Sequence, residues 1–270
     1  MRQAPAPLRV RVTDRAQKPR CGLARALSKL GYCSRSQAAE LIRAGRVRLN
    51  GTVQRNPETP VKRACDRITV DGDNVHTNTR LYWMLNKPRG LVTTASDEKG
   101  RATIYRCLPA HLPWLAPVGR LDQASEGLLL LTNDPEWAAR ITDPETHLPK
   151  TYHVQISAIP SLALCHRLQQ GIRSGNDDLR ANHAHVLRAG KKNGWLEVVL
   201  DEGKNRHIRR MLAALDLEVL RLVRVTIGSL QLGSLAKGAS RPLTERERKD
   251  LDAEVRDSAS HESRRATLSR

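Results

Sequence analysis

The chain has 270 residues, with 46 Lys and Arg against 28 Asp and Glu and a formal net charge of +18 at pH 7. This length can bury a core in one large domain or two smaller ones, which excludes a miniature stapled scaffold, and the excess of basic residues favours a polyanionic partner. Apolar runs stay far below the roughly 20 residues of a membrane-spanning helix, and the first residues lack the apolar centre of a secretion signal. We therefore expect a cytoplasmic protein that makes no contact with a membrane.

The cysteines and the first twenty residues indicate further what kind of protein this is. Five cysteines are widely spaced and form no Cys-x-x-Cys pair, which predicts reduced thiols and favours neither a disulfide framework nor a zinc site. Residues 1–20 hold six basic residues, three prolines and one acid, with too little apolar material to fold alone. We expect these residues to form a disordered basic arm.

Residues 21–72 are predicted to form a small unit of two helices and a short sheet. Apolar residues at helical spacing begin at Leu23 and end at Gly31, and Ser34 with Gln37 has the spacing of a capping box for a second helix. The Asn50-Gly51 pair between two alternating runs predicts a tight hairpin, because both residues tolerate positive φ angles. A further strand is expected at residues 68–70, and the polar residues 73–80 are expected to be a linker.

The charged side chains of residues 21–50 are almost all basic. An ordinary solvated helix surface mixes both signs, whereas residues 21–50 carry a single acid. The pattern predicts a basic face that includes Arg25, Arg35, Arg43 and Arg46.

Residues 81–245 are strand-rich with interspersed helices. Apolar segments suited to buried or half-buried strands occur at residues 81–85, 128–132, 151–156, 195–200 and 220–227. Asp134 before Pro135 predicts a helix start, and another helix is expected over about residues 206–215. Because short turns separate neighbouring strands too often for regular βαβ crossovers, we expect an α+β fold with a mixed, mainly antiparallel β-sheet and flanking helices. Residues 246–270 are predicted to be a charged tail.

Signatures of the common nucleotide-driven and triad enzymes are absent from the sequence. It contains no Gly-x-x-x-x-Gly-Lys phosphate loop, no Gly-x-Gly-x-x-Gly, no Gly-x-Ser-x-Gly and no His-Glu-x-x-His. His183 and His185 flank Ala184 on an expected strand, which puts both on one face, but no third ligand is close in the sequence. We therefore expect surface histidines and no metal site.

The most informative segment is residues 118–134. Asp122 follows an apolar approach and precedes a fully apolar strand, so we expect a loop bracketed by core elements to hold its carboxylate in a poorly hydrated cleft. A carboxylate there needs a cationic partner, and cations are available at Arg120 and in residues 202–210. The competing interpretation is an ordinary capping or turn aspartate.

Five motifs follow one another along this part of the chain. They are Leu-Asn-Lys-Pro-Arg-Gly at residues 85–90, Gly-Arg-Leu-Asp leading to Leu-Leu-Leu-Leu-Thr-Asn-Asp within residues 119–134, Lys-Thr-Tyr at 150–152, Glu-Gly-Lys-Asn-Arg-His-Ile-Arg-Arg-Met at 202–211, and Arg-Val-Thr-Ile-Gly at 224–228 before Leu-Gly at 232–233. Each motif alone is weak, but together and in this order they resemble the RsuA family of ribosomal RNA pseudouridine synthases. Residues 21–72 likewise resemble the small RNA-binding domain of ribosomal protein S-four type that many members carry. The resemblance covers most of the chain outside the two tails.

The resemblance implies an isomerase that acts on a uridine already inside RNA. The bond from the sugar to the ring nitrogen breaks, the uracil turns, and a ring carbon attaches to the sugar, without a cofactor or an energy source. By their places in the motifs, Asp122 corresponds to the catalytic aspartate, Tyr152 to the base-stacking tyrosine and Arg209 to the cation paired with the aspartate. Arg120 is similar to the arginine that helps hold the target nucleotide out of its helix. Asp122 would act either by attack on the sugar carbon or by abstraction of a sugar proton.

The chemistry of these residue types agrees with the resemblance. A nucleotide within a stack is out of reach and has to be flipped out, and an aromatic face with guanidinium groups offsets the energy that flipping requires. The remaining basic residues of the motifs are candidates for contacts with the RNA: Lys150, Lys204, Arg206 and Arg210.

Two residues depart from the family pattern. Ser125 stands where threonine is common, and His207 stands where glutamine is common, which changes hydrogen bonding beside Arg209. We expect a monomeric enzyme that modifies ribosomal RNA, with large-subunit RNA preferred over small-subunit RNA. The alternative is a non-catalytic RNA-binding or ribosome-assembly factor with the same fold, against which the intact set of Asp122, Tyr152 and Arg209 argues. A generic nucleic-acid-binding protein would explain the charge but not an aspartate in an apolar loop.

Overall fold

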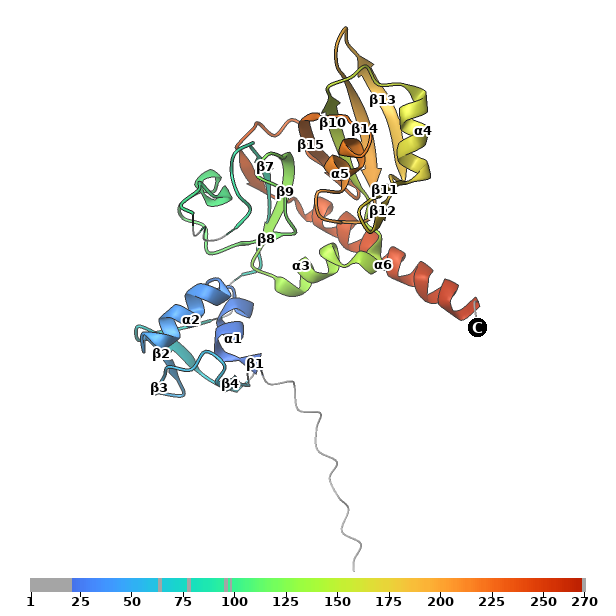
Figure 1. The fold of residues 1–270 in the computed structure, drawn as a ribbon. Helices are drawn as coiled ribbons and strands as arrows, with labels where there is room; N and C mark the ends of the chain where they lie inside the picture. Colours follow the sequence, from blue (N-terminus) through green and yellow to red (C-terminus); the bar gives the residue numbers. More distant parts are fainter. Residues whose placement is uncertain (1–20, 63–64, 77–78, 95–96, 98, 269–270) are drawn as a thin grey trace, which may run out of the picture. The chain divides into compact units, whose positions relative to one another are not determined.

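The computed structural model describes residues 21–62, 65–76, 79–94, 97 and 99–268, with side chains up to residue 257 (Figure 1). The predicted arm at residues 1–20 lies outside this range. Contacts divide the chain into two compact units, Met1–His76 and Thr77–Arg270. No helix among the described residues combines the length and the apolar character that crossing a membrane requires.

The smaller unit has the two helices and the short sheet that the sequence predicts. In chain order its elements are β1 (Cys21–Gly22), α1 (Leu23–Lys29), α2 (Arg35–Arg43), β2 (Val47–Leu49), β3 (Thr52–Gln54), β4 (Pro60–Val61), β5 (Ile68–Val70) and β6 (Asp73–Asn74). Four of the strands form a sheet in the order β3-β2-β5-β6, and β1 pairs with β4. Leu23 and Leu27 of α1 and Ile42 of α2 share one core with Val47 and Val70 of the sheet.

Local sequence signals determine where a helix begins and where a hairpin turns in this unit. The hydroxyl of Ser34 accepts a hydrogen bond from the Gln37 backbone N–H at 3.2 Å, and the Gln37 side chain accepts one from the Ser34 backbone N–H at 3.1 Å, which is the predicted capping box. Asn50 and Gly51 form the hairpin turn with φ of +52° and +86°. Residues 73–76, expected in the linker, belong to the unit, because β6 pairs with β5 and Val75 packs against the core.

The larger unit is built on a sheet of nine strands. Its elements are β7 (Tyr82–Lys87), η1 (Ile104–Cys107), β8 (Ala116–Val118), β9 (Glu126–Thr132), α3 (Pro135–Thr142), η2 (Pro144–Thr146), β10 (Lys150–Ile156), α4 (Leu162–Gln170), β11 (Ile172–Ser174), β12 (Asp177–Leu179), β13 (His183–Ala189), β14 (Gly194–Leu200), α5 (His207–Ala213), β15 (Val219–Ile227), β16 (Leu230–Gln231), β17 (Ser240–Pro242) and α6 (Glu245–Leu268).

The sheet order is β13-β14-β10-β15-β9-β7-β17, with β16 paired to β15 and β8 paired to β9. All of these pairs are antiparallel except β15 with β9, which is parallel. This is the mixed, mainly antiparallel α+β arrangement that the sequence predicts. Strand β9 is buried at every position, which explains its unbroken apolar run, since a strand covered on both faces has no side exposed to water.

Apolar side chains cover both faces of the sheet at β9. On one face Leu128 packs with Trp137 of α3 and Leu251 of α6. On the other face Leu129 packs with Leu121, from the loop that precedes the strand. The loop before β9 is therefore anchored in the core through its apolar residue.

The C-terminal residues differ from the predicted tail. Residues 246–257 belong to helix α6, and Leu251 and Val255 are buried in the core of the larger unit. These two residues lie four positions apart on one helix face, a short apolar signal within a segment that is otherwise strongly charged. Helix α5 is also shorter than predicted and begins after Arg206, whose φ of +50° keeps that residue outside the helix.

Candidate active site

The loop between β8 and β9 carries Asp122 and is tied to the fold by its backbone. The Thr93 hydroxyl donates to the Leu121 carbonyl at 2.7 Å, the Gly90 N–H donates to the Gln123 carbonyl at 2.8 Å, and the Ser125 N–H closes a turn on the Asp122 carbonyl at 3.0 Å. The chain thus holds the backbone of Asp122 in place and leaves the side chain directed outward.

The Asp122 carboxylate is more hydrated than the sequence suggests. Its side chain is 37% exposed, whereas the preceding Leu121 is buried. The expectation of a poorly hydrated cleft is therefore wrong for the carboxylate itself. The apolar neighbours bury the leucine and the loop backbone, and the carboxylate lies where a substrate can reach it.

A buried lysine donates hydrogen bonds to the backbone of the same loop. The Lys87 ammonium at the end of β7 donates to the carbonyls of Ser125 at 2.8 Å, Asp122 at 3.1 Å and Pro88 at 3.2 Å, and the side chain is fully buried. Burial lowers the pKa of Lys87 to about 8, although the charges of Asp122 and Glu126 act in the opposite direction. Lys87 belongs to the motif at residues 85–90, and the sequence offers one signal for its role, a lysine that ends an apolar strand.

Two arginines of the 202–211 motif lie on the Asp122 loop. Arg206 is the ion-pair partner of Asp122, with 3.9 Å between its Nη1 and the carboxylate Oδ2. The predicted pairing of Asp122 with Arg209 is not the contact in this structure, because Arg209 donates to the carbonyls of Ala124 at 3.1 Å and Val219 at 3.4 Å. The pKa of Arg209 is lowered, because burial and the charge of Arg206 outweigh the opposite effect of the Asp122 carboxylate. Arg209 therefore braces the loop within the electrostatic reach of Asp122.

Tyr152 lies on the face of the sheet that carries this loop. It packs both against the apolar cluster that contains Leu121 and against the cluster under α4 and α5. Strand register places Tyr152 beside Arg224, Arg224 beside Gly127, and Gly127 beside Lys87. Tyr152 and Lys87 therefore belong to one row of residues across the sheet.

Gly127 permits this row because β9 and β15 approach very closely. A Cβ atom at Gly127 would lie 2.2 Å from the Arg224 carbonyl oxygen and 2.7 Å from its backbone nitrogen, and φ is +103°. Only glycine meets both conditions without displacement of the backbone. The glycine follows the Asp122 loop directly, so it sets where that loop leaves the sheet.

The other predicted substrate-binding residues of the larger unit differ in their surroundings. Arg120 is exposed. Lys204 contacts the Glu202 carboxylate at 2.8 Å, and Arg210 donates to Asp177 and to the Ser174 carbonyl, both at 2.7 Å. Arg210 is thus tied to the hairpin of β11 and β12 in addition to any contact with RNA.

Lys150 is half-buried at the start of β10. Burial and the nearby charge of Arg224 lower the pKa of Lys150 to about 8, against the charge of Asp201. Arg224 is itself buried and donates to the Leu128 carbonyl at 2.8 Å. Two cations therefore lie close together near Tyr152, and the buried one, Arg224, is held by the backbone of β9.

Three histidines of the larger unit are half-buried or buried beside other side chains. His207 is buried at the start of α5, and burial lowers its pKa. His185 and His153 approach the two oxygens of the Glu197 carboxylate at 3.7 Å and 3.2 Å. The described residues contain no cluster of three or more metal-ligating side chains.

A buried carboxylate next to the loop was not anticipated. Glu126, at the first position of β9, accepts from Arg221 through both oxygens at 3.1 Å and also pairs with Lys237. Burial alone would raise the pKa of Glu126, but these cations outweigh burial and lower it. A glutamate before Gly-Leu-Leu is the only sequence signal, and the two partners lie about one hundred residues away in the chain.

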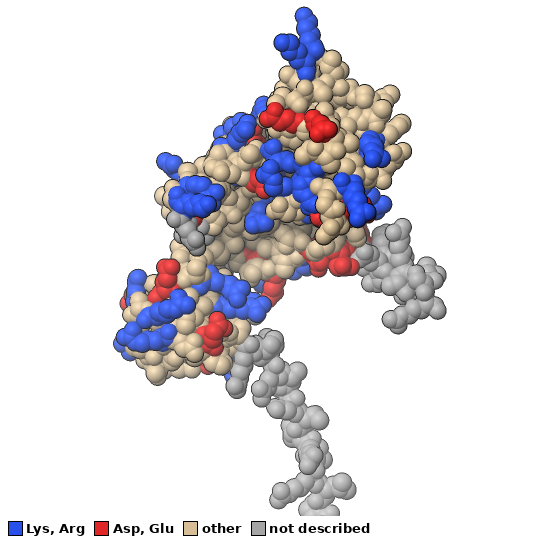
Figure 2. All heavy atoms as spheres, viewed as in Figure 1, with Lys and Arg blue, Asp and Glu red and all other residues tan. Residues whose placement is uncertain are grey.

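Basic side chains are concentrated on both units. Figure 2 shows Lys and Arg side chains grouped around the α5 region of the larger unit and spread over the smaller unit. In the smaller unit Arg25, Arg35 and Arg43 are exposed, whereas Arg46 pairs with the Asp71 carboxylate. Arg46 is accordingly less available to a phosphate than the other three.

Family models and individual known proteins both match this chain. Residues 81–214 match the family model described as RNA pseudouridylate synthase, and residues 21–68 match the S4 domain. The ribosomal large subunit pseudouridine synthase B of Bacillus subtilis is 36% identical over 236 residues, which covers 86% of this chain and 95% of that protein. An RNA pseudouridine synthase of Aquifex aeolicus without an assigned target is 36% identical over 222 residues, or 82% of this chain and 89% of that protein.

A solved structure extends the similarity to the fold. A crystal structure of a pseudouridylate synthase is 31% identical, with a TM-score of 0.60, and the match covers 86% of this chain and 99% of that one. Sequence, fold and domain order agree with the resemblance that the five motifs indicate. The chain belongs to the RNA pseudouridine synthase family, as an isomerase with an N-terminal RNA-binding domain.

Proposed function

We propose that this enzyme converts a specific uridine of ribosomal RNA to pseudouridine, with Asp122 as the catalytic carboxylate and large-subunit RNA as the preferred substrate. The similarity to the Bacillus subtilis enzyme, which is named for the large ribosomal subunit, supports the choice of RNA. We place the reaction in the cytoplasm.

One observation carries the assignment of Asp122. Its carboxylate is accessible and pairs with Arg206, while hydrogen bonds donated by Lys87, Thr93, Arg209 and two backbone N–H groups to the carbonyls of residues 121–125 fix its position. A fixed loop that presents an accessible carboxylate is the arrangement of a reacting group, since catalysis depends on holding that group within a fraction of an ångström. A turn aspartate would direct its carboxylate to its own backbone.

The chemistry follows from this arrangement. The flipped uracil would stack on the Tyr152 ring, and the half-buried cation at Lys150 would favour its phosphate or its anionic ring. The glycosidic bond from C1′ to N1 breaks, the uracil turns, and C5 bonds to C1′ while its proton passes to N1, so atoms and electrons balance within one nucleotide. Asp122 acts at the sugar, and Arg206 holds its negative charge.

Exposed arginines supply affinity for the rest of the RNA. Arg25, Arg35 and Arg43 of the smaller unit and Arg120 of the larger one are suited to phosphate contacts, which position an RNA without reading its sequence. These contacts supply most of the binding energy and make it salt-dependent.

The proposal is tested by mapping pseudouridines in ribosomal RNA from cells with and without this gene. We expect one position of large-subunit RNA to lose its pseudouridine and to regain it when the gene is restored. Loss from small-subunit RNA would correct the choice of RNA, and an unchanged map would reject ribosomal RNA as the substrate. Restoration by Asp122→Asn would reject the assigned carboxylate while leaving the substrate class intact.

A further inference from the structure

One face of the large sheet lies opposite to the face that carries Tyr152. Val154, Leu196 and Leu222 point toward α4 and α5 and are buried with them. Because side chains alternate along a strand, their neighbours point to the opposite face of β13, β14, β10 and β15. We call this opposite face the outer face.

Strand register arranges the outer face in two adjacent rows. Its side chains are half-buried or exposed, so this half of the sheet is open on that face. One row consists of His185, Glu197, His153 and Val223, and the next consists of Arg188, Trp195, Gln155 and Arg221.

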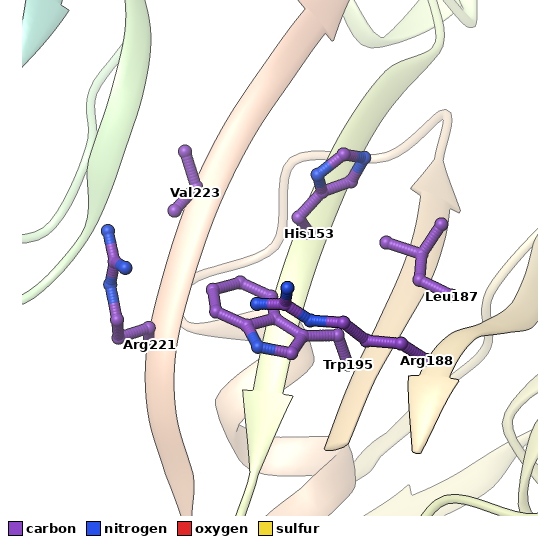
Figure 3. Close-up of a pocket in the computed structure, with 6 residues that line it drawn as sticks. All are labelled: His153, Leu187, Arg188, Trp195, Arg221 and Val223. Carbon is purple, nitrogen blue, oxygen red and sulfur yellow. The ribbon is translucent and has the colours of Figure 1, made fainter. Parts of the chain in front are cut away.

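Two guanidinium groups lie near the indole ring of Trp195 on this face. The Cζ atom of Arg188 is 5.2 Å and that of Arg221 is 5.5 Å from the centroid of the indole ring. Figure 3 shows Arg188 reaching across the indole from β13, and Arg221 approaching from the side of β15. These residues, with His153, Leu187 and Val223, line a cavity of about 380 Å³, which is within the size range of pockets for small ligands.

The two arginines differ in their freedom to move. Arg221 is held by the bidentate contact with the buried Glu126. Arg188 is exposed and has no ion-pair partner among the residues that the structure describes. Arg188 can therefore leave the indole for a phosphate group, which uncovers the ring while Arg221 stays in place.

The charge around the cavity favours an anionic ligand. The hairpin between β13 and β14 ends in Lys191 and Lys192, both exposed, and Figure 2 shows basic side chains at the end of this hairpin. Glu197 is shared by two histidines. An aromatic ring with exposed cations beside it is a combination that binds single-stranded nucleic acid, with the base on the ring and the phosphate on the cations.

The cavity is connected to the Asp122 loop through Arg221. Arg221 lines the cavity and pairs with Glu126, which follows Asp122 by four residues. Four residues span no more than about 14 Å even when fully extended. The chain of contacts from the cavity to the Asp122 loop is therefore short, although the two lie on opposite faces of the sheet.

We propose that the Trp195 cavity binds a nucleotide of the substrate RNA outside the target uridine, with its base on the indole and its phosphate on Arg188. The inference rests on the proposed function, since it assigns a second contact to the same RNA. It adds a stacking site on the face of the sheet opposite to the one that carries Tyr152.

Equilibrium binding to the full-length protein tests this site without any turnover. The probe is a fluorescein-labelled single-stranded oligouridylate of twelve nucleotides, followed by anisotropy over a range of salt concentrations. Loss of one stacked base predicts a dissociation constant about 5- to 100-fold higher for Trp195→Ala with an unchanged salt slope. Trp195→Phe should restore most of the affinity. Arg188→Ala should reduce the salt slope by about one, because one phosphate contact is lost.

Matched variants keep the outcome decisive. Arg167→Ala removes the same charge from an exposed position of α4, on the other side of the sheet, and should leave the slope unchanged. Equal losses of salt slope for Arg167→Ala and Arg188→Ala would overturn the inference. Wild-type affinity for a folded Trp195→Ala would also overturn it. So would variants that weaken binding of an acidic peptide but not binding of the RNA probe. If Trp195→Ala does not fold, Arg188→Ala at its exposed position decides the question. Asp122→Asn should bind the probe normally, so failure here is distinct from failure of the catalytic assignment.

Discussion

Lys87 offers a direct test of how the fold positions the candidate carboxylate. In Lys87→Met a side chain of similar length replaces the buried ammonium, and the carbonyls of Pro88, Asp122 and Ser125 lose a shared donor. The Asp122 carbonyl keeps its bond from the Ser125 N–H, so the loss is greatest at the other two. We expect the loop to shift while the fold persists.

The effect of this change on stability follows from two opposing contributions. Each buried carbonyl left without a donor costs about 1–3 kcal/mol. Relief from burying the ammonium is worth about 3 kcal/mol, because burial lowers the pKa of Lys87 from 10.5 to about 8. The two contributions partly cancel, so the free energy of unfolding at pH 7 should change by no more than about 3 kcal/mol.

The effect on activity is larger. A displacement of about 1 Å at a catalytic group costs up to about a hundredfold in rate, so we expect the kcat for pseudouridine formation to fall at least tenfold. Single-turnover assays on ribosomal RNA transcripts and urea unfolding measure the two quantities. Lys249→Met is the control, because that side chain is 67% exposed and pairs only within its helix. Normal turnover by Lys87→Met, or loss of the fold, would refute the role given to this lysine.

The pH dependence provides a second readout for the same residue. Between pH 8 and 10.5 the folded Lys87 has released its proton and the unfolded one has not, so the unfolded state binds more protons and stability rises with pH. Lys150 has a lowered pKa of about 8 and contributes to the same window. Lys87→Met should remove its share of the rise and leave that of Lys150.

Three further predictions concern the surroundings of the loop. Gly127→Ala should destabilise the chain by more than about 3 kcal/mol in urea unfolding, because its Cβ would meet the Arg224 backbone; wild-type stability would contradict the close approach of β9 and β15. Arg221→Met should cost about 1–3 kcal/mol, since Glu126 keeps only Lys237. The ionised Glu126 stabilises the fold above the usual carboxyl pKa, and this contribution is lost as pH falls through its lowered pKa. Acid unfolding of Arg221→Met should therefore show this loss of stability at a higher pH than the wild type. An identical acid-unfolding profile would argue against the pair. Joint alanine substitution of Arg25, Arg35 and Arg43 should flatten the salt dependence of RNA binding by up to about three in slope, and an unchanged slope would exclude a phosphate-binding face on the smaller unit.

Elements with strong local signals could be predicted from the sequence. The capping box at Ser34, the Asn50 hairpin and the cap at Asp134 involve residues within three positions of one another, and the structure has all three. The five main strands are present because each carries an apolar run. Short strands such as β11, β12 and β16 have two or three residues, and tertiary pairing alone defines them.

Contacts between distant segments could not be predicted in the same way. The motifs brought Asp122, Tyr152 and Arg209 to attention, but only the fold shows that Arg206 is the residue beside Asp122 and that Arg209 holds the loop backbone. The left-handed conformation of Arg206 directs its side chain, and no residue pattern encodes it. Leu251 and Val255 are a further case, because two apolar residues in a charged segment reveal a buried helix only once their partners are known.

The central claim is that the accessible carboxylate of Asp122 carries out the isomerisation. Asp122→Asn keeps the size and the loop hydrogen bonds of this residue and removes only its charge. We predict no detectable pseudouridine in a ribosomal RNA transcript treated with Asp122→Asn, while the transcript binds within about tenfold of the wild-type affinity, since phosphate contacts supply most of the binding energy. Pseudouridine formation at the wild-type rate by Asp122→Asn would contradict the account.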